Sequence, residues 1–95
     1  MKAYELLNSE DKWTQHSYAV DELGCDCQSS LKEAVKWCAI GALRKCYNYD
    51  PNFYNSDYEE VYMKLFHSIK NTNITRWNDS NPYQTVYNKL KELDI

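Results

Sequence analysis

Four cysteines and two histidines are the side chains of this 95-residue chain that could act as nucleophiles or metal ligands. A nucleophilic site would combine Cys38 and His16 with the carboxylate of Asp79 or the amide of Asn78. A reactive thiolate needs a helix N-terminus or a neighbouring cation to lower its pKa. The apolar spacing instead places Cys38 deep inside a helix, so the sequence favours a buried thiol and assigns no catalytic residue.

A zinc site would use the pair Cys25 and Cys27 together with Cys38, Cys46 or His16. Structural zinc sites prefer cysteine pairs with at least two intervening residues, and this pair has a single one. A disulfide between Cys25 and Cys27, or between Cys27 and Cys46, would need an oxidising compartment. We therefore predict no bound metal and no other cofactor, and both alternatives at Cys25 and Cys27 stay open.

Two tryptophans, Trp13 and Trp77, lie outside the predicted helices, and polar residues flank each of them. Tryptophan and arginine are enriched in binding hot spots, which favours a binding surface built from the two loops. The predicted binding residues are Trp13, Gln15, His16, Tyr18 and Asp21 in the first loop, and Arg76, Trp77, Asn78 and Asp79 in the second. In the alternative interpretation, Asn78 and Asp79 hydrogen-bond to the backbone and support the entry to the last helix.

The net charge of −3 is unevenly distributed, because acidic side chains outnumber lysines in residues 1–30. Binding of nucleic acid needs a concentrated cationic surface, which this chain lacks, so we expect no direct contact with nucleic acid. An acidic surface fits a protein partner that carries a basic groove. Nine tyrosines suit half-buried positions and interfaces, because each has an apolar ring and a polar tip.

No apolar run approaches the roughly 18–20 residues of a membrane span. The first residues, MKAYELLNSEDKW, contain no apolar core of a signal peptide. We therefore expect a cytoplasmic protein with reduced cysteines and no contact with a membrane. A glycine-rich phosphate loop is excluded, because Gly24 and Gly41 are the only glycines.

The segment SLKEAVKWCAIGALRKCY predicts a central helix over residues 30–47. Ser30 and Glu33 match a capping box, and apolar side chains at helical spacing cover two sides of this helix. Gly41 inside a helix costs about 1 kcal/mol against alanine. We expect that a neighbouring helix approaches closely at this position and that this contact explains the presence of a glycine.

Three further helices are predicted over residues 2–8, 56–70 and 82–94. Residues 9–29 read as a long irregular loop, which in a small domain is usually functional or conceals an element. A small hairpin turning at Gly24 is the alternative. The sequence thus predicts one all-α domain over residues 1–95, a bundle of about four helices.

Three short motifs follow one another along the chain: Trp13-Thr14-Gln15, Trp37-Cys38-Ala39-Ile40-Gly41-Ala42-Leu43 and Trp77-Asn78-Asp79. In these motifs the chain resembles a family of short bacterial and phage proteins that carry a domain of unknown function. The likeness covers about residues 4–93. It implies a mostly helical single domain and no particular activity. His16 and the Tyr- and Asn-rich residues 47–57 are not part of the pattern.

Because no reaction motif is present, the sequence favours binding over catalysis. The first hypothesis is a protein-interaction module, such as a phage-type small inhibitor or regulator of a host protein. The second is a small enzyme or ligand-binding domain that uses the loops of residues 13–21 and 76–79. This second hypothesis requires both loops to meet at one concave pocket.

Overall fold

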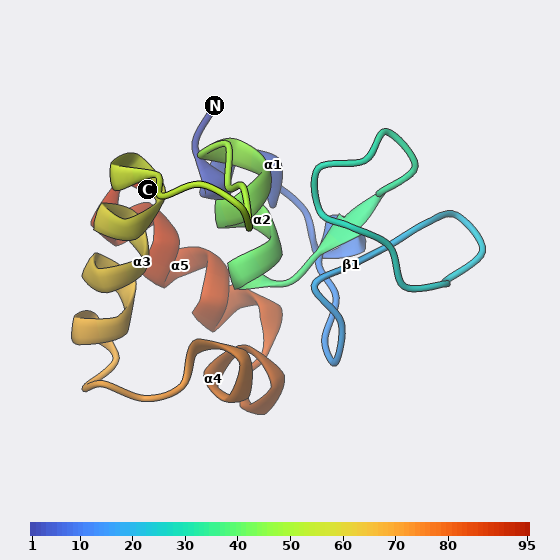
Figure 1. Cartoon of the computed structure of the whole chain (residues 1–95). Helices are drawn as coiled ribbons and strands as arrows, with labels where there is room; N and C mark the ends of the chain where they lie inside the picture. The colour runs from blue at the N-terminus through green and yellow to red at the C-terminus, as the bar shows by residue number, and fades with distance from the viewer.

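Helices gather on one side of the molecule, and a small sheet with its long turns lies on the other (Figure 1). The computed structural model describes all residues from 1 to 95. The elements in chain order are α1 (Ala3–Leu6), the 3-10 helix η1 (Glu10–Lys12), β1 (Ala19–Val20), β2 (Lys36–Trp37), α2 (Ala39–Cys46), α3 (Ser56–Ser68), α4 (Ile74–Ser80) and α5 (Tyr83–Leu93).

Helix α2 occupies the centre of the fold and packs against α1, α3 and α4, while α5 packs against α1 and α3. Most residues of α2 are buried, and Ala42 and Leu43 are fully shielded from solvent. Burying one leucine or valine stabilises a fold by about 1.5–3 kcal/mol. The largest fully buried apolar side chains around α2 are Leu7, Leu43, Leu65, Ile74, Leu90, Ile95 and Val86.

Helix α1 is held in place by the other end of the chain. The Ala3 amide donates to Ile95 O (2.7 Å), and Lys2 Nζ lies 2.9 Å from Asp94 Oδ2. One helical turn is unstable alone in water, so its burial against the core is what maintains it. The predicted first helix is confirmed, with Ala3 and Leu7 as its buried anchors.

The central helix begins later than predicted. It starts at Ala39, so the predicted helix over 30–47 is correct only in its second half. Ser30 and Glu33 are exposed and form no capping box, because turns and then β2 occupy this stretch. β2 pairs with β1, and the Trp37 indole N–H donates to the Ser29 carbonyl (2.9 Å). These tertiary contacts outweigh the local helical pattern.

The predicted irregular loop over residues 9–29 is also corrected, because it contains η1 and β1. β1 pairs antiparallel with β2. Val20 also bridges to Asp26 across a turn in which Gly24 has a φ of 80°, so the hairpin considered as an alternative is present. The fold is therefore mostly helical rather than all-α. Strands of two residues leave no alternating pattern that could reveal them in the sequence.

Helix α4 occupies residues for which the sequence predicted a polar connection. Asn73 is the N-cap of α4, since the Asn73 Oδ1 accepts from the Arg76 amide (3.0 Å). The side chain of Ile74, the first residue of the helix, is buried. A helix of seven residues with few apolar side chains shows little periodicity. The helix contains all four residues of the second predicted loop, Arg76, Trp77, Asn78 and Asp79, so this part of the predicted surface is helical.

The two longest helices, α3 and α5, confirm the predictions over 56–70 and 82–94 apart from small shifts at their ends. Asn55 is the N-cap of α3, because its Oδ1 accepts from the Tyr58 amide (3.0 Å). The predicted inward stripes of both helices are buried or half-buried.

Candidate functional site

The two predicted loops lie side by side. The Gln15 side-chain amide donates to the carbonyls of Asn78 (3.3 Å), Asp79 (3.1 Å) and Asn81 (3.2 Å). The His16 amide donates to Asp79 Oδ1 (2.9 Å). The segment after η1 is thus fastened along the C-terminal half of α4, which meets the geometric condition of the ligand-binding hypothesis.

Asn78 is the centre of this contact and is fully buried. Its Oδ1 accepts from Trp13 Nε1 (2.8 Å) and from the Ala39 amide (2.9 Å). Its Nδ2 donates to Thr14 O (3.1 Å) and to Asp79 Oδ1 (3.1 Å). All four hydrogen-bonding positions of the amide are therefore used. Asn78 supports the fold by joining three distant segments, so it is not available to a ligand.

The two tryptophans of the predicted site are half-buried and pack against the hydrophobic core. The Trp13 ring lies 6.0 Å from the Tyr83 ring, centroid to centroid. Thr14 N donates to the Trp37 carbonyl (3.1 Å), so the strand pair and the first loop are joined here. Trp13 therefore joins the first loop to Asn78 of α4 and to Tyr83 of α5, while Trp77 packs against the core.

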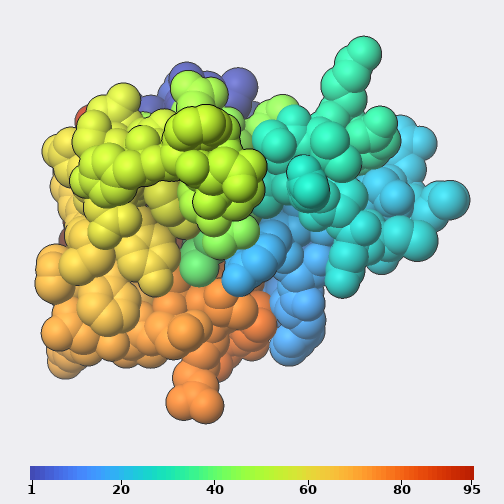
Figure 2. Space-filling model, viewed as in Figure 1, coloured from blue at the N-terminus to red at the C-terminus, as the bar shows by residue number.

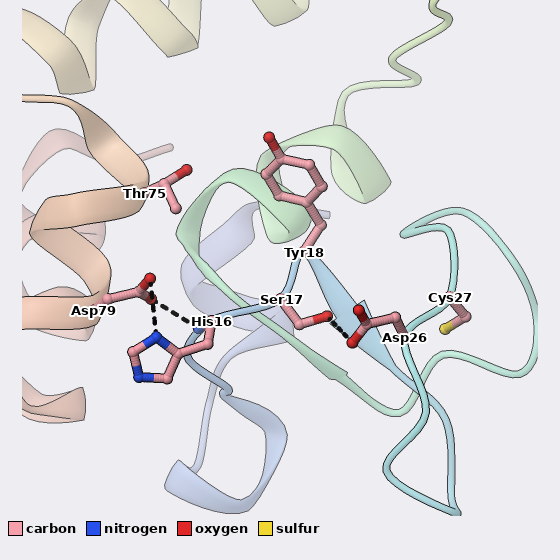
Figure 3. A pocket seen from close by; sticks show the side chains of 7 residues that line it. All are labelled: His16, Ser17, Tyr18, Asp26, Cys27, Thr75 and Asp79. Carbon is pink, nitrogen blue, oxygen red and sulfur yellow. Dashed lines mark hydrogen bonds and ion pairs between the residues drawn. The ribbon is translucent and has the colours of Figure 1, made fainter.

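His16 is the exposed member of the contact. Its backbone has a positive φ of 67°, and its side chain is 78% exposed. Its Nδ1 lies 3.5 Å from Asp79 Oδ2 (Figure 3). These residues line a concave region of about 470 Å³, which we call the His16 hollow; its lining residues are His16, Ser17, Tyr18, Asp26, Cys27, Thr75 and Asp79.

No nucleophile contacts the His16 imidazole. The Ser17 hydroxyl donates to Asp26 Oδ1 (2.8 Å) and to the Ala19 carbonyl (2.9 Å). Figure 3 shows the Cys27 sulfur well away from the imidazole, with Ser17 and Asp26 between them. Burial, followed by nearby carboxylates, raises the pKa of the Cys27 thiol, which opposes thiolate formation. No nucleophile is therefore paired with His16 in this hollow.

The sequence predicted Cys38 to lie deep inside a helix, and this prediction is wrong, because Cys38 is the N-cap of α2. Its Sγ accepts from the Gly41 amide (3.4 Å), and the residue is only 2% exposed. A helix N-terminus favours a thiolate, but here burial raises the pKa of the thiol. Cys38 does not line the hollow that contains His16, so the two are not assembled into a nucleophilic site.

We expect Cys38 to resist alkylation in the native protein, because it is buried and its thiol pKa is raised. Cys25, which is exposed, is the internal control. After treatment with iodoacetamide at neutral pH, peptide mass spectrometry should find Cys38 modified about 100-fold or more slowly than Cys25, since its reaction requires opening of the fold. Equal rates at the two cysteines would contradict the buried position of Cys38.

The four cysteines are free thiols. No group of three or more histidine, cysteine, aspartate or glutamate side chains is placed to hold a metal ion. No helix has the length and hydrophobicity that a membrane span would require.

The family model described as a family of unknown function (DUF6197) matches residues 1–87. The chain belongs to this family. The sequence-based prediction of a family of uncharacterised domains is thereby confirmed. The comparisons with curated proteins and with solved structures give no match.

A second hollow adjoins the His16 hollow, and a third adjoins the second. The Arg44 hollow, of about 460 Å³, shares Tyr18, Asp26 and Cys27 with the His16 hollow; its other lining residues are Gln28, Ser29, Ser30, Arg44, Tyr49 and Pro51. The Phe53 hollow, of about 290 Å³, shares Tyr49 and Pro51 with the Arg44 hollow and adds Asp50, Asn52, Phe53, Tyr54, Asn55, Tyr58 and Glu59. We call the three together the groove.

Figure 2 shows the segments that form the groove meeting on one face of the molecule. The segment around residues 48–54 stands forward and borders those around 15–18 and 25–30, with α4 below. Residues far apart in the sequence therefore share one surface.

The remaining predicted residues have separate positions. Asp21 lies outside the groove, and its Oδ1 accepts from the amides of Leu23 (2.9 Å) and Cys25 (3.0 Å), which closes the Gly24 turn. Arg76 is exposed in a shallower concave region beside the His16 hollow, which it shares with Thr75 and Asp79. Tyr18 belongs to two of the hollows.

Sequence reasoning missed Arg44, Tyr49 and the exposed aromatic residues Phe53 and Tyr54. The helical pattern over residues 30–47 gives Arg44 no particular role, and residues 47–57 lie outside the three motifs. The available signal was compositional, since an arginine near the end of a helix precedes the aromatic run YNYDPNFY. Only the folded chain shows that Tyr18 and Arg44 meet beside this run.

Proposed function

We propose that this protein is a protein-binding module and that the groove is its contact surface. The observation that carries the proposal is that three hollows joined by shared residues end beside two exposed aromatic side chains. Phe53 is 74% exposed and Tyr54 is 81% exposed.

Exposed aromatic rings beside a concave surface are typical of binding sites. When a partner covers such rings, their apolar surface is removed from water, which favours binding. An aromatic side chain has few rotatable bonds, so little conformational entropy is lost when it is fixed. Phe53 and Tyr54 pack little against their own chain, so they contribute little to the stability of the isolated fold. A role in association explains their exposure better than a role in folding.

The charge of the groove favours a basic segment of the partner. Its acidic lining residues are Asp26, Asp50, Glu59 and Asp79, and its cationic lining residue is Arg44. Of these carboxylates only that of Asp79 has an ion-pair partner, His16. Lysine or arginine side chains of a partner would complement this surface. A phage-type inhibitor or regulator would act in this way by covering a basic region of a host protein.

We expect the double replacement F53S/Y54S to weaken partner binding by about 100-fold or more, because hot-spot aromatics each contribute about 2–4 kcal/mol. The partner is identified by quantitative affinity capture, and its affinity for each purified variant is then measured by calorimetry. L23S is the matched control, since Leu23 is 88% exposed but lies outside the groove. It should bind as the unmodified protein does.

The ionic contribution is measured in the same assay. Binding should weaken as the salt concentration rises, and D26N should reduce this dependence, because the carboxylate of Asp26 lies in the groove. Equal affinities of F53S/Y54S and L23S for the partner would overturn the proposal. So would the failure of the intact protein to select any partner.

The meeting of the two loops supports a second candidate, a small ligand-binding domain centred on the His16 hollow. Its lining is mostly polar, and its size suits a small molecule. A melting temperature that rises with a small polar compound, and does so less in T75V, would support this candidate. Thr75 lines this hollow but not the two others. An unchanged melting temperature across such compounds would exclude it.

A further inference from the structure

Arg44 lies in the last turn of α2, where aromatic rings flank its guanidinium group. Its Cζ is 4.4 Å from the centroid of the Tyr18 ring and 4.3 Å from that of the Tyr49 ring. Cation–π contacts of this kind contribute about 0.5–2 kcal/mol each and fix the plane of the guanidinium. The Tyr49 amide also donates to the Arg44 carbonyl (3.1 Å). The side chain is therefore held in one place.

The charge of Arg44 has no acidic partner in the protein. None of the ion pairs includes it, and its Nε is buried without an acceptor. Burial opposes the charge, but the neighbouring Tyr58, Tyr49 and Tyr18 hydroxyls together raise the pKa of Arg44, so it stays positive. Burying a cation or a polar N–H without a partner is unfavourable. An acceptor that enters the hollow and reaches the accessible part of the guanidinium would pair with its charge.

The surroundings of Arg44 suit a small polar group. The Arg44 hollow has a volume of about 460 Å³, and Gln28, Ser29 and Ser30 line it together with the two tyrosines. Their hydroxyl and amide groups can donate hydrogen bonds to the same acceptor. The hollow also lies between the other two hollows of the groove, since it shares residues with each.

We infer that the Arg44 hollow binds the side-chain carboxylate of an aspartate or glutamate within the partner segment. This inference rests on the proposed function and refines it. The planar fork of N–H donors on arginine matches the two oxygens of a carboxylate. Because the Arg44 hollow lies between the other two hollows, a bound segment would continue on both sides of it. The carboxylate therefore belongs to a side chain rather than to a chain terminus. The partner segment is thus basic, with one acidic residue between the positions that contact the two ends of the groove.

Asp26 distinguishes a carboxylate from a phosphate. Its carboxylate lines the same hollow and would repel a second negative group, most strongly one that carries two charges. For a doubly charged phosphate the repulsion by Asp26 and the attraction to Arg44 both double and largely offset each other, whereas the cost of removing water from the ion rises with the square of its charge. The hollow should therefore prefer a carboxylate to inorganic phosphate.

Nuclear magnetic resonance of the arginine Nε–H groups tests the inference directly, because Arg44 and Arg76 are the only arginines in the chain. The probe is N-acetylglutamic acid α-amide, which carries a single side-chain carboxylate. N-acetylglutaminamide is its neutral match, N-acetylalanine supplies a terminal carboxylate, and inorganic phosphate supplies the other anion. All four are titrated at equal ionic strength.

The side-chain carboxylate should shift the Arg44 signal in a saturable manner and leave that of Arg76 unchanged. R44K keeps the charge but lacks the fork, so backbone signals of Ser29 and Ser30 should then report affinity lower by about tenfold or more. R76Q is the control and should bind as the unmodified protein does. Equal shifts at both arginines, equal binding of the neutral amide, or tighter binding of N-acetylalanine or phosphate would each overturn the inference.

The outcome is separable from that of the proposed function. If the carboxylate fails to bind while F53S/Y54S still abolishes partner binding, only the Arg44 inference is wrong. If the carboxylate binds but F53S/Y54S and L23S bind the partner equally, the proposed role of the groove is wrong.

Discussion

Replacing Asn78 with alanine is expected to lower the free energy of unfolding by about 3–5 kcal/mol. The side chain is fully buried and makes four hydrogen bonds. Its removal leaves donors at Trp13 and Ala39 and an acceptor at Thr14 without partners, and each buried unsatisfied group costs about 1–3 kcal/mol. Domains of this size are usually stable by only 5–15 kcal/mol, so the loss is severe. Denaturation with urea, followed by tryptophan fluorescence, measures it.

Two further variants sharpen this test. N81A is the matched control, because Asn81 follows the same helix, is half-buried and donates only to Trp77 O (2.8 Å). It should cost about 1 kcal/mol, the usual contribution of one hydrogen bond. If N78A is no more destabilising than N81A, the central role of Asn78 is wrong.

The isosteric change N78D separates hydrogen bonding from packing. The new carboxylate keeps the acceptor, loses both donors and lies beside Asp79, so at neutral pH it should destabilise about as much as N78A. Burial and the neighbouring charge would raise the pKa of this carboxyl in the folded state. The penalty should be complete above that raised pKa and should shrink as the pH falls toward the unfolded value of about 3.9.

Gly41 to alanine is the second change with a large expected effect, a loss of about 3 kcal/mol or more from overpacking. In an open helix the same change would stabilise by about 1 kcal/mol. Here a Cβ atom would overlap the backbone carbonyl of Tyr18, nearer than real Cβ atoms approach, and would also lie 3.2 Å from Ser29 Oγ. The Tyr18 carbonyl cannot easily retreat, because it accepts a hydrogen bond from the Cys38 amide (3.2 Å).

Gly24 to alanine is the control for this prediction. A Cβ atom at Gly24 meets nothing within 4 Å, and the cost arises only from its φ of 80°. That cost should be about 1 kcal/mol. Thermal and urea denaturation of both variants compare the two. A Gly41 variant as stable as the unmodified protein would show that Tyr18 does not approach α2 closely.

The Gly41 contact also bears on the groove. The carbonyl of Tyr18 rests against α2, while its ring lies over the guanidinium of Arg44. The sequence analysis expected a neighbouring helix at Gly41, and that expectation is corrected, because the close neighbour is the backbone just before β1. The absence of a side chain at Gly41 therefore lets the first loop reach the surface where the groove forms.

Local patterns were sufficient wherever an element is long and regularly amphipathic. Helices α3 and α5 have apolar side chains at regular helical spacing, and both lie within their predicted ranges. The short first helix also lies within its predicted range of residues 2–8. The same reasoning failed over residues 30–38, where apolar side chains at helical spacing belong to turns and to a strand. The difference lies in Trp37, whose partners Thr14 and Ser29 the spacing does not reveal.

The amino-acid sequence by itself determined the predominance of helix, the net negative charge and the membership of an uncharacterised family, and it marked residues 13–21 and 76–79 as two candidate binding loops. Tertiary structure alone decided what each residue of those loops does. In the folded chain Asn78 is buried, His16 is exposed and Tyr18 contacts Arg44. The physical reason is that a helix is specified by neighbours along the chain, whereas a hydrogen-bond partner or a groove depends on which distant segments become adjacent on folding.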